Sequence, residues 1–286
     1  MTVQEKAYAK INLFLDVTGK RKDGFHDILS VMHSVGLADE VEVTATRADY
    51  SCITLQMENS SLPNDERNIA YLAAEAFLAK TGLEATVHIK IEKHIPDCAG
   101  LGGGSSDAAA VLRAMNTALG KPLTAAALCE LGATLGSDVP FCIVGGTRLC
   151  KGRGEILESY PMEPLTVVLC TPHAERVSTP EAYRLLDEAF DDYRKENVLL
   201  HEALFGFFTE DPVLGMYNVF EGVLLPQLPE ADEIRAYFLA HGALGAMMSG
   251  SGSTVFALFE KDEEAETVVR ELPGAVLCHS APAHTI

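Results

Sequence analysis

A glycine-rich segment restricts the possible folds of this chain more than any other stretch. Residues 98–107 read CAGLGGGSSD, with glycine at four of the five positions 100–104. An alternating apolar and polar run over 86–96 precedes it, which predicts a strand. The alanine-rich run that follows over 105–122 predicts a helix, stopped near Gly120 and capped by Ser105 or Ser106. The sequence therefore predicts a strand, a loop almost free of side chains and a helix in succession.

This loop and the helix after it favour the binding of a phosphate. The N-terminus of a helix offers free amides and the positive end of a dipole, and both attract an anion. Glycines also let the main chain close around a ligand. The predicted phosphate-binding residues are Gly100, Gly102, Gly103, Gly104, Ser105 and Ser106. A tight turn that binds nothing is the alternative, since short glycine motifs also occur in ordinary turns.

The common nucleotide-binding motifs do not describe this loop. No lysine follows the glycines, so the Walker pattern is absent. Ser105 stands where a dinucleotide-binding loop has its third glycine, and no acidic residue lies at the distance that such a loop requires. The protein-kinase signatures H-R-D and D-F-G are also missing.

Two charged residues lie in apolar surroundings and are candidates for catalysis. Lys10 lies within AYAKINLFLDV and Asp138 within LGSDVPF. An unpaired buried charge is costly, so each is expected to have a partner. If the two pair with each other, the carboxylate stays ionised and can act as a general base. The alternatives are a lysine that reaches solvent from a strand edge and an aspartate that only caps the next turn.

A second glycine and serine loop lies near the C-terminal end. Residues 247–256 read MMSGSGSTVF, between two apolar runs that predict strands. A tight turn between these strands is one interpretation. Two such loops in one chain favour a site for a polyphosphate.

The remaining patterns predict a mixture of strands and helices. Asp23 and Gly24 predict a turn, and Pro161 and Pro164 mark a candidate domain junction. Predicted strands cover 10–19, 31–46, 52–58 and 165–172, predicted helices cover 69–82 and 124–136, and a helical stretch covers roughly 180–240.

Composition excludes some classes of partner. The net charge of −19, from 22 basic and 41 acidic residues, argues against binding to nucleic acid, which needs clustered lysine and arginine. The seven cysteines form no CxxC pair, so we expect reduced thiols in a cytoplasmic enzyme rather than a zinc site or disulfides. The start of the chain lacks a signal-peptide pattern, and no apolar run predicts a membrane span.

Three of these segments, taken in order, resemble the motifs of the GHMP kinase superfamily (galacto-, homoserine, mevalonate and phosphomevalonate kinases). They are AYAKINL, PDCAGLGGGSSDAA and MSGSGSTVF, and the segment GKRKDGFHDI resembles the branch whose substrate is a cytidyl diphosphate sugar alcohol. The resemblance implies an α+β, two-domain GHMP kinase fold. Residues 1–158 would form a ribosomal protein S5 domain 2-like domain that binds ATP, and residues 159–286 a ferredoxin-like α/β domain.

The resemblance also implies the roles of individual residues. Asp138 would take the proton from the 2-hydroxyl of the substrate, and Lys10 would orient and polarise that pair. ATP would be bound with Mg²⁺, whose ligands are not assigned. Nucleotide-binding residues would be Asn68, Lys93, Pro96, Leu101 and Asn116, together with the loop residues Gly100, Gly102, Gly103, Gly104, Ser105 and Ser106. Substrate-binding residues would be Asn12, Phe25, His26, Tyr183, Ser249, Gly250, Ser251 and Gly252.

Two other functions remain open at this point. One is a mevalonate- or homoserine-type kinase, which the segment around Phe25 and His26 disfavours. The other is a regulator that binds a nucleotide without turnover, which the retention of both Lys10 and Asp138 disfavours. We further expect a monomer or a weak homodimer.

Overall fold

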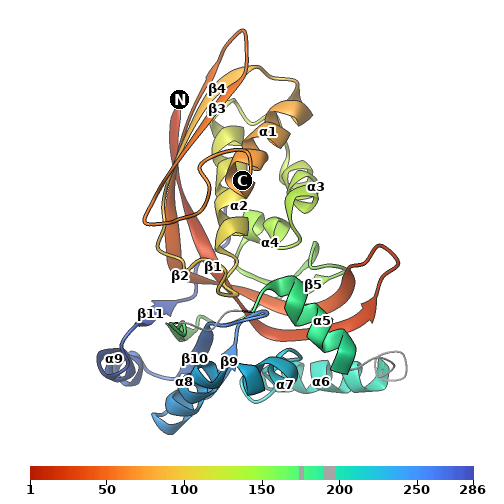
Figure 1. The fold of residues 1–286 in the computed structure, drawn as a ribbon, viewed down its shortest axis with the longest axis vertical. Coiled ribbons are helices and arrows are strands. Elements are labelled where there is room, and N and C mark those ends of the chain that lie inside the picture. The colour runs from red at the N-terminus through yellow and green to blue at the C-terminus, as the bar shows by residue number, and fades with distance from the viewer. Residues whose placement is uncertain (174–176, 190–197) are drawn as a thin grey trace.

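Two β-sheets organise the chain, whose computed structural model describes residues 1–173, 177–189 and 198–286 (Figure 1). Within this described part, the larger sheet has seven strands and the smaller sheet has four. Helices α1 to α4 lie together on one side of the larger sheet, and the smaller sheet lies at one end of the molecule with α8 and α9 (Figure 1). This mixture of sheets and packed helices confirms the predicted α+β class.

The larger sheet is built on a long antiparallel hairpin of β1 and β2, which pair from Thr2 opposite Thr44 to Lys20 opposite His26. Register shifts after Tyr8, Asn12 and Val17 bend this hairpin. The strands of this sheet are β1 (Thr2–Lys20), β2 (His26–Arg47), β3 (Cys52–Glu58), β4 (Ala85–Glu92), β5 (Thr147–Lys151), β6 (Ile156–Ser159) and β8 (Tyr217–Asn218). The strands predicted over 10–19 and 31–46 are confirmed, although both are longer than the local patterns indicated.

Local signals account for the helices on this sheet. They are α1 (Ile69–Thr81), α2 (Gly103–Ala118), α3 (Ala125–Leu135) and α4 (Val139–Val144). Gly82 ends α1 with a φ of 64°, a left-handed conformation that suits glycine, and Thr124 caps α3 through its side chain. The helices predicted over 69–82 and 124–136 are therefore confirmed.

The smaller sheet has the strand order β11-β7-β10-β9. Its strands are β7 (Thr166–Cys170), β9 (Gly245–Met248), β10 (Val255–Phe259) and β11 (Ala275–His279). Helix α8 (Pro229–Ala240) packs on β9 and β10, and α9 (Asp262–Glu271) packs on β7 and β11. The strand predicted over 165–172 is confirmed, and so is the placement of the second glycine loop between two strands.

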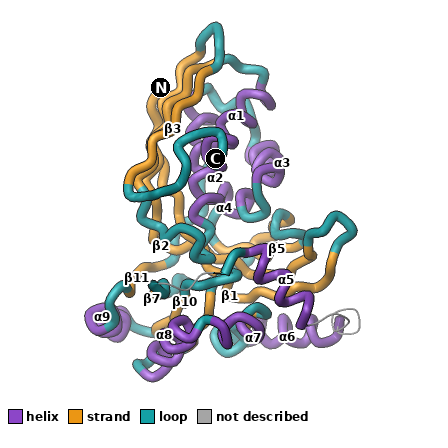
Figure 2. Tube along the Cα trace, viewed as in Figure 1, coloured by secondary structure: helices purple, strands orange, loops and turns teal. Residues whose placement is uncertain are grey.

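The segment over 180–240 is helical with an interruption. It contains α5 (Thr179–Ala189), α6 (Val198–Glu210), α7 (Glu221–Leu224) and a short 3₁₀ turn, η1 (Leu225–Gln227). The two-residue strand β8 interrupts it, and residues 190–197 of the predicted stretch lie outside the described residues. Figure 2 shows α5, α6 and α7 near the far end of the β1–β2 hairpin.

Apolar packing between the sheets places the candidate residues of β1. Ile11 and Leu13 are fully buried and pack in one cluster with side chains of the smaller sheet, including Phe256. Burial of each such side chain stabilises the fold by roughly 1.5–3 kcal/mol. Because successive side chains of a strand point to opposite faces, Lys10 and Asn12 face the other way. The division of the chain at residues 158 and 159 stays a prediction.

Candidate active site

Lys10 and Asp138 lie together, as the sequence predicted. The Nζ atom of Lys10 lies 3.7 Å from Oδ2 of Asp138. Only 4% of Lys10 is exposed, so the interpretation as a lysine that reaches solvent is wrong. Asp138 stands at the N-cap position of α4, but within the described residues its side chain makes no capping hydrogen bond. Its carboxylate, 29% exposed, is therefore accessible to a ligand.

Asn12 holds the ammonium of Lys10 in place. Nζ of Lys10 donates a hydrogen bond to Oδ1 of Asn12 at 2.7 Å, and Nδ2 of Asn12 donates to Oγ of Ser30 at 2.9 Å. Ser30 in turn donates to the backbone carbonyl of Phe14 at 2.7 Å. Since an ammonium has no acceptor, the amide of Asn12 can take only one orientation here. Ser30 has no local sequence signal and was not among the predicted residues.

The first glycine loop contacts Lys10 directly. The backbone amide of Lys10 donates to the carbonyl of Leu101 at 2.9 Å. Gly102 adopts a φ of 71°, and a Cβ atom there would lie only 2.9 Å from Cγ of Lys10. This position requires glycine both for its backbone conformation and for its closeness to the lysine.

Helix α2 starts earlier than the sequence predicted. Its cap is Gly102 rather than a serine, so Ser105 and Ser106 lie inside the first turn. Ser106 instead donates to the carbonyl of Tyr8 at 2.5 Å, and this contact with a distant strand is the reason that the predicted cap is wrong. Among the described residues no side chain caps the helix, which leaves its first amides available to an anion.

The second glycine loop packs against the first. Oγ of Ser249 donates to the carbonyl of Gly100 at 3.0 Å, and a Cβ atom on Gly100 would lie 2.1 Å from the carbonyl oxygen of Ser249. A Cβ atom on Gly250 would lie 3.2 Å from Nζ of Lys10. The absence of side chains therefore brings both loops and the lysine together at one point.

The side-chain amide of Asn218 binds the backbone of the second glycine loop. Its Nδ2 donates to the backbone carbonyls of Met248 at 2.7 Å and of Gly250 at 2.8 Å, and only 3% of the residue is exposed. Asn218 was not among the predicted residues. The available signal was a single amide side chain within the mostly apolar run MYNVF.

Lys93 lies beside the first turn of α2. A Cβ atom on Gly103 would be 3.3 Å from its Nζ. The ammonium is buried between Asp39, at 2.5 Å, and Asp107, at 2.7 Å. Burial, together with the neighbouring carboxylate of Asp39, raises the pKa of Asp107 above its ordinary value, although Lys93 opposes this shift. Asp39 and Asp107 were not among the predicted residues.

The two predicted asparagines make local contacts. Asn68 caps α1, since its Oδ1 accepts from the amide of Ala70 at 2.9 Å. Asn116 bonds both backbone groups of Leu123, at 2.9 and 3.0 Å. It lies thirteen residues after Gly103, about 20 Å along the helix axis. The structure therefore does not bring Asn116 to the glycine loop.

The remaining predicted residues of the nucleotide site differ in exposure. Leu101 is 1% exposed and belongs to the apolar cluster between the sheets. Pro96 is partly buried in the segment that joins β4 to the loop. A Cβ atom on Gly104 would fit, because its nearest neighbour would be Cγ2 of Ile69 at 3.5 Å.

The end of the hairpin carries the predicted substrate residues. His26 is buried, stacks on the ring of Tyr183 at 4.6 Å between centroids, and has its Nε2 atom 2.8 Å from Oδ1 of Asp187. Phe25 is half exposed and lies under the guanidinium of Arg153, 4.8 Å from the ring centre. The ring of Tyr183 thus covers one face of the imidazole of His26. Asp187 and Arg153 were missed, because nothing in their own segments indicates the contact.

Helix α5 connects this hairpin to the second glycine loop. At its start, Oγ1 of Thr179 lies within hydrogen-bonding distance of Oγ of Ser251, at 3.1 Å. Two turns later it reaches His26 through Tyr183 and Asp187. Helix α5 therefore contacts both the second glycine loop and the end of the hairpin.

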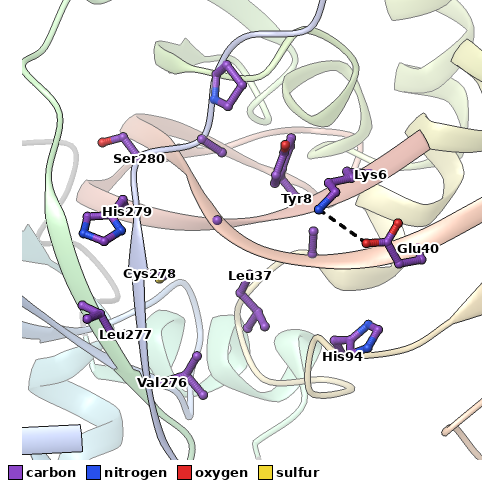
Figure 3. A pocket seen from close by; sticks show the side chains of 14 residues that line it. Lys6, Tyr8, Leu37, Glu40, His94, Val276, Leu277, Cys278, His279 and Ser280 are labelled. Atoms are coloured by element: carbon purple, nitrogen blue, oxygen red, sulfur yellow. Dashed lines mark ion pairs between the residues drawn. The ribbon is translucent and has the colours of Figure 1, made fainter. Parts of the chain in front are cut away.

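A separate cavity of about 590 Å³ lies between the start of the β1–β2 hairpin and the segment around β11 (Figure 3). Lys6 and Glu40, which line it, form an ion pair at 3.5 Å. Of the predicted site residues, all of which lie in the described part of the chain, none lines this cavity. The candidate active site is therefore the meeting point of the two glycine loops and not this cavity.

Family models match both halves of the chain. The GHMP kinases N terminal domain matches residues 68–146, and the GHMP kinases C terminal domain matches residues 203–276. The first match contains the glycine loop and Asp138, and the second contains Asn218 and the second loop.

Similar proteins narrow the family further. A 4-diphosphocytidyl-2-C-methyl-D-erythritol kinase of Exiguobacterium sibiricum is 42% identical, with 96% of this chain and 95% of the relative covered. The enzyme of the same name from Brevibacillus brevis is 44% identical, with 96% and 94% covered.

Solved structures agree with this assignment. A crystal structure of 4-(cytidine 5'-diphospho)-2C-methyl-D-erythritol kinase is 32% identical, has a TM-score of 0.76, and is matched over 98% of this chain and 100% of that one. A homoserine kinase from Cytophaga hutchinsonii has a TM-score of 0.78 at 20% identity, over 99% and 95%, which shows the shared fold alone. The predicted GHMP kinase fold is confirmed, and this chain belongs to the 4-diphosphocytidyl-2-C-methyl-D-erythritol kinases of the GHMP kinase family.

Proposed function

We propose that this kinase transfers the terminal phosphate of ATP to the 2-hydroxyl of 4-diphosphocytidyl-2-C-methyl-D-erythritol, a step of the non-mevalonate isoprenoid pathway. The observation that carries the proposal is the pair of Lys10 and Asp138, 3.7 Å apart, where two glycine loops meet. Close relatives with that name support the choice of substrate.

Asp138 acts as the general base. A hydroxyl is a weak nucleophile, so a carboxylate that accepts its proton lowers the barrier to attack on the phosphate. Lys10 attracts the negative charge of that carboxylate and is itself held by Asn12 at 2.7 Å. Since phosphoryl transfer depends mainly on positioning and charge neutralisation, a rigid lysine is well suited to this place.

The first glycine loop holds the phosphates of ATP. Helix α2 offers uncapped amides after Gly102, and its dipole favours negative charge there. The predicted nucleotide residues from Gly100 to Ser106 surround this helix start, and Lys93 lies beside it.

Mg²⁺ fits the side chains around the phosphate site. This ion keeps several waters and the phosphate oxygens of its substrate, so it needs only one or two protein oxygens. Oγ of Ser105 lies close to the turn at Gly136 that leads to Asp138, so a hydroxyl and a carboxylate lie near the loop. We propose Ser105 as the residue that would hold Mg²⁺, with the carboxylate of Asp138 left free to accept the proton. When bound, the ion neutralises charge on the phosphate oxygens.

The cytidyl part of the substrate would lie at the end of the hairpin. His26, Phe25 and Tyr183 offer aromatic surfaces and a ring edge there. The predicted residues of the second loop, Ser249 to Gly252, would bind the part of the substrate nearer the reacting hydroxyl.

The cellular setting follows from the same proposal. We propose a cytoplasmic enzyme that acts as a monomer or a weak homodimer and binds no nucleic acid. Among the described residues, no helix has both the length and the apolar character needed to cross a bilayer.

A substrate panel tests the proposal. Purified protein with Mg²⁺ and ATP is offered the cytidyl substrate, mevalonate or homoserine, and ADP release is measured together with the phosphorylated product. We expect phosphorylation of the cytidyl substrate and of neither alternative. Turnover of mevalonate or homoserine alone would support the sister activities, and absence of turnover with all three would support a regulator.

A further inference from the structure

His26 has a fixed partner on a distant helix. Its Nε2 atom lies 2.8 Å from Oδ1 of Asp187, on α5. The other oxygen of this carboxylate, Oδ2, accepts a hydrogen bond from Nζ of Lys20 at 2.7 Å. The imidazole side chain of His26 is 7% exposed, whereas the carboxylate of Asp187 is 28% exposed. The carboxylate of Asp187 is therefore partly buried and binds both Nε2 of His26 and the ammonium of Lys20.

The acid decides which ring nitrogen bears the proton. Although burial opposes it, hydrogen bonds from Lys20 and His26 lower the pKa of Asp187 below its ordinary value. An ionised carboxylate has no proton to donate, so Nε2 of His26 must be the donor. In the neutral ring, Nδ1 is then left as an acceptor.

The same helix also fixes the plane of the ring. Tyr183 lies four residues before Asp187, one helical turn away, and therefore on the same face of α5. Its ring stacks on His26 with an angle of 23° between the planes. Within the described residues Nδ1 of His26 makes no hydrogen bond, so this acceptor remains for a ligand.

We propose that Asp187 is a positioning residue that sets the choice of nucleobase by holding His26 as an acceptor at Nδ1. This inference rests on the proposed function, in which the hairpin binds the cytidyl group. Cytosine carries an amino group where uracil carries a carbonyl oxygen. An acceptor at Nδ1 binds the amino group and repels the carbonyl oxygen, and a site of this kind discriminates strongly because the wrong base leaves it unpaired.

The first experiment measures the tautomer of His26 without any turnover. The ¹⁵N signals of the imidazole ring are recorded for the full-length protein at pH 8, where an ordinary histidine is neutral. The variant His26→Gln identifies the signals by their loss. We expect a proton on Nε2 in the wild type and a mixture of tautomers in Asp187→Ala. A proton on Nδ1 in the wild type, or an unchanged spectrum in Asp187→Ala, would overturn the proposal.

The second experiment measures base preference. The ratio of kcat/KM for the cytidyl substrate to that for its uridyl analogue is compared between the wild type and Asp187→Asn. We expect this ratio to fall about tenfold in Asp187→Asn, the size of effect that one polar contact gives, and to recover in Asp187→Glu, which keeps the acid. The control is Glu188→Gln, next along α5, whose exposed carboxylate pairs only on the surface with Arg184.

The two experiments separate the two proposals. If the wild type acts on neither base, the proposed function fails, and the base preference that rests on it is rejected as well. If the wild type phosphorylates the cytidyl substrate and the ratio is the same in Asp187→Asn, only the role of Asp187 is rejected. If Asp187→Asn does not fold, Asp187→Ser replaces it, with the same expected fall in the ratio.

Discussion

The ammonium of Lys10 lies 3.7 Å from the carboxylate of Asp138, although one residue is on a strand at the start of the chain and the other begins α4. Neither group is held by the other alone. Lys10 is fixed by Asn12 at 2.7 Å, and Asp138 by its place before the buried residues Val139 and Pro140. A pair held from both sides keeps its geometry while a substrate binds and leaves.

Replacing the proposed base tests this pair most directly. We expect Asp138→Asn to lower kcat by a factor of about 10² to 10⁴, the range for loss of a general base. Binding of ATP should change little, because the nucleotide loop is intact. Turnover is measured by coupled ADP detection and ATP binding by calorimetry. Near-normal turnover would remove Asp138 as the base, and Asp65→Asn, on the surface with Arg67, is the control.

Gly102 offers a test of how the loop and the lysine fit together. In Gly102→Ala the new Cβ atom would lie 2.9 Å from Cγ of Lys10, so the lysine must move. We expect a loss of stability of about 1–3 kcal/mol from the left-handed backbone and, in addition, a large fall in kcat. The control is Gly82→Ala, with a similar φ of 64° and open space around it.

The comparison of these two glycine variants separates the effect of backbone strain from the effect of displacing Lys10. Gly82→Ala should lose stability in urea denaturation and keep its kcat. If Gly102→Ala also keeps its kcat, the position of Lys10 does not depend on this contact.

Asn218 should matter more for stability than a typical surface amide. Asn218→Ala leaves two buried carbonyls, of Met248 and Gly250, without their partner. Each unsatisfied buried group costs about 1–3 kcal/mol, so we expect a loss of roughly 2–5 kcal/mol, measured by urea denaturation. Gln227→Ala, which removes an exposed amide bonded to one helix carbonyl, should lose far less. Equal losses in both variants would contradict the bracing role of Asn218.

His33 should make the protein sensitive to acid. Burial lowers its pKa from 6.5 to about 4, and its ring nitrogens lie 2.8 Å from the hydroxyls of Thr147 and Ser280. Between pH 6.5 and 4 the unfolded chain binds a proton at this residue and the folded chain does not, so stability falls as the pH falls. The contribution lost reaches about 3 kcal/mol at pH 4, since each pKa unit is worth about 1.4 kcal/mol.

The measurement compares wild type with His33→Gln by urea denaturation at several pH values from 7 to 4. The wild type should lose more stability over this range than the variant does. Parallel curves would show that His33 does not titrate as described. His88→Gln, at an exposed site beside Thr54, is the control and should follow the wild type.

Local rules were sufficient wherever a residue acts on its own neighbours. Gly82 ends a helix and Thr124 starts one because their conformations and caps involve residues within four positions. The same rules failed at Ser106, whose hydroxyl bonds the carbonyl of Tyr8 on β1 instead of capping α2. A contact between segments replaced the local one.

By itself, the sequence predicted two glycine loops that favour phosphate binding, a lysine in an apolar run that needs a partner and an aspartate in an apolar segment, and the family resemblance implied that they form one phosphate-transferring site. These features stand out in the sequence for two reasons. Glycine loses much conformational freedom on folding, and a charged residue in an apolar run is costly unless it has a partner. Only the tertiary structure decided which groups support them. Ser30, Asn218 and Asp187 hold Asn12, the second loop and His26 from distant segments, and neither segment of such a pair shows which distant group the other one supplies.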